Sequence, residues 1–101
     1  MKILYIGVHT NEIWRSEFWI SKAFKDLGHE IIEYDYKSNH KKFKTWRKIG
    51  KELSYLEKNT KPDIIISHPI LINNNEFTLI KEKVEKLIGR DIFYNAIEFL
   101  T

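Results

Sequence analysis

Four short runs of β-branched and aliphatic residues divide the chain. The first, from Lys2 to Val8, has almost no polar interruption, which is typical of a strand buried on both faces in a parallel sheet. The second follows Gly28 and the third follows Pro62, and both residue types commonly end a helix. The predicted strands are 2–8, 30–36, 64–68 and 91–97.

Amphipathic segments separate these strands. Within each of them apolar side chains recur at the 3.6-residue spacing of one helix face. The predicted helices are 13–27, 43–59 and 76–88, and the predicted loop is 37–42. Thr10, Asn11 or Ser16 is expected to cap the first helix, and Gly28 to end it in the left-handed conformation.

Strands that alternate with helices favour an α/β fold with a parallel sheet and right-handed crossovers. We expect a single Rossmann-like or flavodoxin-like domain over residues 1–101. Its four-stranded parallel sheet would have the order 2-1-3-4, with helices on its faces. The core is modest and the sheet has open edges, so a homo-oligomer is expected.

The composition narrows the class of protein. The 101 residues include no Cys, which excludes a disulfide framework, a thiolate metal site and a cysteine nucleophile. Hydrophobic residues make up 43% and charged residues 31%, a balance that permits a packed core. No segment approaches the roughly 20 apolar residues of a membrane span. These features predict a cytoplasmic protein.

The positive charge is concentrated in one segment. The chain has 17 Lys and Arg against 14 Asp and Glu, yet residues 37–51 hold seven cations and no acid. The four cations predicted on one helix face are Lys44, Arg47, Lys48 and Lys51. Such a face either is simply solvated or attracts an anion, nucleic acid, an anionic membrane or an acidic partner protein.

Ligands of open parallel sheets bind beyond the carboxyl ends of the strands, where the strand order reverses. The candidate ligand-binding residues at this edge are His9, Thr10, Asn11, Glu12, Arg15, Ser67, His68 and Asn95. With the first and third strands as neighbours, His9 and His68 are expected at the same edge. The helix that begins near residue 13 would direct free N–H groups there, which suits a phosphate or carboxylate.

The chemistry of this edge stays open at the sequence level. His9 beside Glu12 has the residue types of a general base, since imidazole titrates near neutrality. The two histidines with Glu12 lack tight metal-ligand spacing, so no metal or cofactor is expected, and the catalytic residues stay unassigned. The chain has no dinucleotide-binding glycine fingerprint, no P-loop and no hydrolase nucleophile elbow.

Four segments together resemble a known family. Residues 1–7 (MKILYIG), 27–31 (LGHEI), 34–36 (YDY) and 61–68 (KPDIIISH) resemble the N-terminal half of GT-B-type glycosyltransferases. The spore-maturation glycosyltransferases are the most similar group. The likeness covers about the first 70 residues, and 89–95 would fit the next strand.

This resemblance implies a Rossmann-like half with an acceptor site in the loop His9 to Glu12. In those enzymes a C-terminal domain holds the nucleotide-sugar, and no counterpart of it is found in this sequence. The chain is therefore not expected to be an autonomous enzyme, and any catalytic part it plays would be in glycosyl transfer with a partner.

Three functions remain as hypotheses. The first is a small non-catalytic domain that holds a nucleotide, phosphosugar or similar anion at the carboxyl edge of its sheet, as in a phage-type sequestering or regulatory protein. The second is the acceptor-binding half or subunit of a glycosyltransferase. The third is an interaction protein that uses the basic helix 43–59, with nucleic acid and membrane ranked below small ligands as partners.

Overall fold

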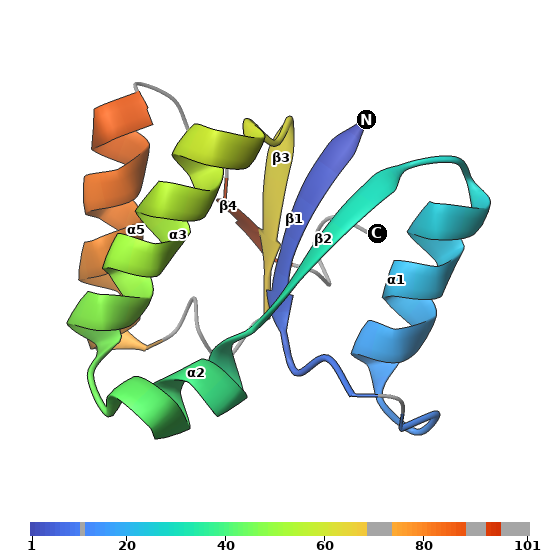
Figure 1. Cartoon of the computed structure of the whole chain (residues 1–101), viewed down its shortest axis with the longest axis horizontal. Helices are drawn as coiled ribbons and strands as arrows, with labels where there is room; N and C mark the ends of the chain where they lie inside the picture. Colours follow the sequence, from blue (N-terminus) through green and yellow to red (C-terminus); the bar gives the residue numbers. More distant parts are fainter. Residues whose placement is uncertain (11, 69–73, 89–92, 96–101) are drawn as a thin grey trace.

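The computed structural model describes residues 1–10, 12–68, 74–88 and 93–95 (Figure 1). Strands and helices alternate along the chain, with two helices in succession after the second strand. Their bounds are β1(Lys2–Gly7), α1(Ser16–Asp26), β2(Glu30–Asp35), α2(Tyr36–Phe43), α3(Trp46–Thr60), β3(Ile64–Ser67), α5(Asn75–Ile88) and β4(Phe93–Asn95).

The sheet is parallel and β1 lies inside it. β1 pairs with β2 on one side and with β3 on the other, and three-residue β4 pairs with β3. Ile3, Leu4 and Ile6 have no exposed surface, because both faces of β1 are covered. The predicted α/β class, with a parallel sheet and flanking helices, is confirmed. Of the strand predicted over 91–97, only residues 93–95 lie within the described structure.

Side chains that alternate along β1 enter two separate cores, one on each face of the sheet. Leu4 and Ile6 pack with Ile49 and Leu53 of α3. On the other face, Ile3 and Tyr5 pack with Ile66 of β3 and Phe24 of α1. Figure 1 shows the result, with α1 on one side of the sheet and α3 and α5 on the other.

The capping of α1 differs from the prediction at one end. The N-cap is Arg15, which makes no side-chain cap hydrogen bond, and Ser16 is already helical. Thr10 lies outside the helix, and Asn11 is outside the described residues. At the other end the expected left-handed Gly28 is confirmed, with φ of 89°.

The backbone bonds beyond α1 explain the need for this glycine. Gly28 N–H donates to Lys25 O and His29 N–H donates to Phe24 O, each at 3.0 Å. These are the two hydrogen bonds of a Schellman motif, which requires a positive φ between the helix and the strand that follows it. The turn therefore leads α1 directly into β2.

The predicted loop over 37–42 is wrong, because these residues belong to α2. The Asp35 carboxylate at the end of β2 accepts a hydrogen bond from Ser38 N–H (3.0 Å) and caps the new helix. Lys44, with φ of 61°, ends it, and the Thr45 hydroxyl caps α3 by accepting from Lys48 N–H. The basic segment therefore forms two helices joined at Lys44 instead of a loop and one helix.

Buried tyrosines carry a polar atom into both cores. Tyr5 is 1% and Tyr34 is 4% exposed, and the Tyr34 hydroxyl has no hydrogen-bond partner among the described residues. Burial, with a smaller contribution from the negative charge of Glu17, raises the pKa of Tyr5. Burial likewise raises the pKa of Tyr34, with Glu52 as the second cause.

These shifts predict alkaline instability. The unfolded chain loses phenolic protons near pH 10, before the folded chain does, so the free energy of unfolding should fall above that pH by about 1.4 kcal/mol per pH unit for each tyrosine. Tyr34→Phe is expected to reduce this slope. It should also stabilise the protein by about 1 kcal/mol at pH 7, because it removes an unpaired buried hydroxyl.

Urea denaturation between pH 7 and 11 measures both effects. Tyr55→Phe is the matched control, since Tyr55 is 67% exposed, and it should behave as the wild type. A Tyr34→Phe protein that is less stable than the wild type at pH 7 would show that the hydroxyl has a partner in solution.

Candidate functional site

The ends of β1 and β3 lie side by side at the carboxyl edge of the sheet. His68 N–H donates to Ile6 O at 2.9 Å, which carries the pairing one residue past β3. Ser67 is fully buried, its hydroxyl has no partner among the described residues, and its backbone pairs with that of Asn95. The main chain thus brings the ends of β1, β3 and β4, all three predicted as parts of the site, together at this edge.

The two histidine side chains nevertheless have separate surroundings. The His9 ring lies edge-on to the Tyr5 ring at 5.0 Å, and its Nε2 donates to Tyr5 O at 2.8 Å. The His68 ring lies 6.0 Å from that of Tyr36, the first residue of α2. Each histidine therefore packs against a different tyrosine, on β1 and on α2 respectively.

The chain's own carboxylates occupy the N–H groups that follow β1. Val8 N–H donates to Glu17 Oε2 (3.0 Å), and His9 N–H donates to Asp35 Oδ2 (3.2 Å). Glu17 is only 5% exposed. Gly7 makes room for it, since a Cβ at Gly7 would lie 2.9 Å from Glu17 Cγ. An added anion would find these donors taken and two negative charges beside it.

Glu12 and Arg15 pair with each other. Arg15 Nε donates to Glu12 Oε2 at 2.8 Å, and Arg15 N–H donates to Glu12 O at 3.1 Å. Both side chains are about one-third exposed. The pair closes a turn before α1. Asn11 lies outside the described residues, as does the side chain of Asn95.

The buried carboxylate leads to a stability prediction. Glu17→Ala should lower the free energy of unfolding by about 2 to 4 kcal/mol, because it leaves Val8 N–H unpaired and opens space over Gly7. Glu82→Ala is the matched control on an exposed helix face and should change stability by less than about 0.5 kcal/mol. Urea denaturation compares the two, and equal small losses would contradict the structural role of Glu17.

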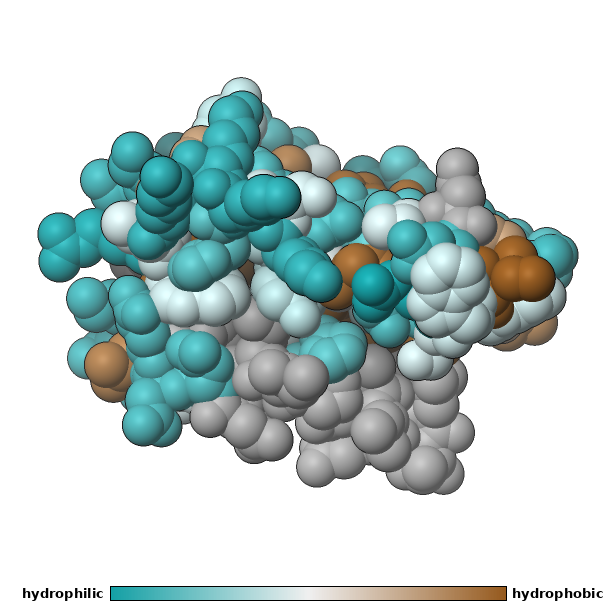
Figure 2. Space-filling model, turned by 90° about the horizontal axis from the view of Figure 1, so that it is seen from below, coloured by the Kyte–Doolittle hydropathy of each residue, from teal (hydrophilic) through white to brown (hydrophobic). Residues whose placement is uncertain are grey.

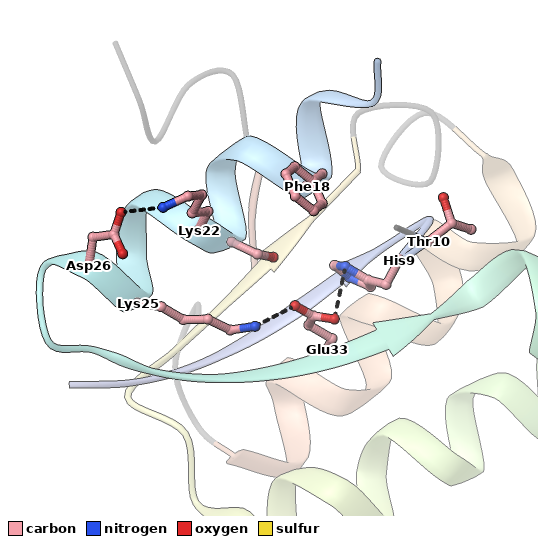
Figure 3. Close-up of a pocket in the computed structure, with 8 residues that line it drawn as sticks. His9, Thr10, Phe18, Lys22, Lys25, Asp26 and Glu33 are labelled. Carbon is pink, nitrogen blue, oxygen red and sulfur yellow. Dashed lines mark hydrogen bonds and ion pairs between the residues drawn. The ribbon is translucent and has the colours of Figure 1, made fainter. Parts of the chain in front are cut away.

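A pocket of about 300 Å³ lies on the α1 side of the sheet (Figure 3). Its walls come from α1, from β2 and from the residues after β1. The lining residues are His9, Thr10, Phe18, Ser21, Lys22, Lys25, Asp26 and Glu33. Of the predicted residues that the structure describes, His9 and Thr10 face this space and the others do not line it.

The charges of the pocket balance within it. Lys25 Nζ lies 2.9 Å from Glu33 Oε1, and Lys22 Nζ lies 3.0 Å from Asp26 Oδ2. Figure 3 shows Glu33 between Lys25 and His9, whose Nδ1 is 3.9 Å from Glu33 Oε2. Two ion pairs and an imidazole thus supply donors and acceptors without an excess of either charge.

Two hydroxyl groups at the pocket are unpartnered. Ser21 is 3% exposed, and its Oγ has no hydrogen-bond partner within the described structure. The same holds for Thr10 Oγ1. Sequence reasoning missed Ser21, Lys25 and Glu33 because they lie inside a helix and a strand instead of at strand ends. The one signal in the sequence is that these polar residues occupy positions facing the boundary between the helix layer and the sheet.

The structure also gathers the predicted cations. We use the term basic surface for the exposed cations of α2, Lys44 and the first half of α3. Its members are Lys37, Lys41, Lys42, Lys44, Arg47, Lys48 and Lys51, all of them exposed. Figure 2 shows hydrophilic side chains crowding the side of the molecule that holds α2 and α3, whereas hydrophobic ones gather on the α1 side.

Two features are absent from the described residues. They contain no cluster of three His, Cys, Asp or Glu side chains placed to hold a metal ion. None of their helices is long and apolar enough to cross a membrane.

The comparisons with known proteins supply no family. The chain matches no protein-family model, and no curated protein or solved structure is significantly similar to it.

Proposed function

We propose that this domain binds a small hydroxyl-rich molecule, such as a sugar or a nucleoside, in the pocket between α1 and β2. The carrying observation is the buried, unpartnered hydroxyl of Ser21 at the wall of a 300 Å³ space. Leaving a buried polar group unpaired costs about 1 to 3 kcal/mol. A ligand hydroxyl that bonds to Ser21 would recover this free energy.

The charge balance of the pocket selects the ligand class. Lys22 and Lys25 are each matched by a carboxylate, so the pocket has no net cation for a phosphate to neutralise. A polyol instead uses ammonium donors and carboxylate acceptors at once. Phe18 adds an apolar surface for the carbon face of a sugar ring. The proposal therefore keeps the ligand-binding function expected from sequence. It assigns recognition to the sugar part of the ligand instead of to its phosphate.

The same pocket supports the glycosyltransferase-like alternative. A hydroxyl-rich site is what the acceptor-binding half of such an enzyme needs, and His9 is at its wall. In this form of the proposal the domain is a Rossmann-like half whose fourth strand spans 91–97 in the order 2-1-3-4. The donor site would come from another chain.

Ser21→Ala gives the sharpest test. Thermal melting is recorded with glucose, N-acetylglucosamine, uridine, adenosine and glucose 6-phosphate. At least one neutral compound should raise the melting temperature of the wild type. Ser21→Ala should remove that shift while the ligand-free protein melts at the same or a higher temperature, because an unpaired hydroxyl is lost.

Ser54→Ala is the matched control, a helix serine outside this pocket, and it should keep the shift. The proposal is rejected if no compound raises the melting temperature, or if Ser21→Ala responds like the wild type. A response to glucose 6-phosphate alone would restore the anion-binding hypothesis.

A further inference from the structure

We propose that the basic surface binds nucleic acid through its phosphate backbone, as a function separate from the small-ligand pocket. The surface combines seven cations from two successive helices and their junction, with no acidic residue in the same stretch of chain. A cluster of this kind on one side of a domain is the electrostatic footprint of a polyanion partner.

The cations of this surface form no ion pairs within the described part of the chain. None of its seven cations has a carboxylate within 4 Å among the described residues. Lys22, Lys25 and Arg15, on the other side of the sheet, each have one. The basic surface therefore holds uncompensated charge whose counterions an approaching phosphate chain can release.

The apolar side chains of this region point elsewhere. Ile49 and Leu53 of α3 are 0% and 1% exposed, since they pack on the sheet. No large hydrophobic side chain between residues 36 and 51 is exposed. Protein interfaces rest on buried aromatic and aliphatic anchors, and amphipathic helices enter membranes by an apolar face. With neither available between residues 36 and 51, charge is what this stretch of the chain can recognise.

The aromatic rings of the region are also engaged. The Trp46 ring lies 4.1 Å from the His40 ring and 6.3 Å from the Tyr36 ring. Proteins that bind single strands rely on exposed rings on which bases stack. Because Trp46 already contacts other rings, we expect contacts to phosphates without readout of the bases.

The shape of the surface concentrates the charge. A groove between α3 and α5 has Arg47 and Lys51 on one wall and Lys83 on the other, with Glu76 and the exposed Leu79 also in its lining. The floor includes Gly50, where a Cβ would overlap the Ile80 side chain, so the two helices pack closely. Cations on both walls of a groove focus the potential and draw a phosphate chain toward it.

The test measures binding of the full chain to a fluorescent 20-base-pair DNA duplex and to the matching single strand, between 50 and 200 mM salt. Arg47→Gln, Lys48→Gln and Lys51→Gln are combined in one variant. At 100 mM salt its affinity should fall at least about tenfold, and the slope of log affinity against log salt should become shallower by about 2.7 for the duplex.

A control variant combines Lys58→Gln, Lys61→Gln and Lys86→Gln, which removes the same charge from other exposed positions. It should bind nearly as the wild type does. An equal loss of DNA affinity in both variants would show that net charge alone determines binding, and it would overturn the proposal. So would a lack of binding to either DNA alongside capture by vesicles with 30% phosphatidylserine, which would assign the surface to a membrane.

Discussion

One buried carboxylate organises the part of this molecule that holds the proposed ligand pocket. Glu17 lies in the first turn of α1, and its side chain is held against the end of β1 by the hydrogen bond from Val8 N–H. Gly7 permits this approach because it has no Cβ. The contact fixes α1 over the sheet without any side-chain cap at the helix start. It also puts a negative charge in the first turn of α1, which disfavours a bound anion at that helix start.

The position of the pocket follows from that constraint. With the end of β1 closed by Glu17 and Asp35, the described residues leave a pocket beside it, between α1 and β2. That space is lined by pairs of opposite charge and by hydroxyls, whereas the region it replaces offers backbone N–H groups. A site lined by ion pairs and hydroxyls favours polyols, and a site lined by backbone N–H groups favours phosphates. The proposed ligand class thus depends on where the side chain of Glu17 lies.

Sequence patterns predicted the parallel α/β fold because its signals, the continuous apolar runs and the glycine after α1, can be recognised from neighbouring residues alone. α2 was not predicted because its start depends on Asp35. The sequence pattern assigns Asp35 to a strand, whereas its carboxylate caps the helix. The candidate residues at the carboxyl edge of the sheet were predicted as a group. Strand order, however, does not determine the direction in which their side chains point. Period-two alternation places His9 and His68 on the Tyr5 side. His68 departs from it because β3 ends at Ser67, and its ring turns to Tyr36.

Charge and hydroxyl chemistry are segregated on the two faces of the sheet. The α1 side holds ion pairs that cancel, and α2 and α3 hold cations that do not. A net charge of +3 hides this asymmetry, since the acids that offset the seven cations are elsewhere. A polyanion would therefore meet α2 and α3 first, leaving the pocket beside α1 accessible. Because α1 and α3 share only the sheet between them, each face can be occupied without blocking the other.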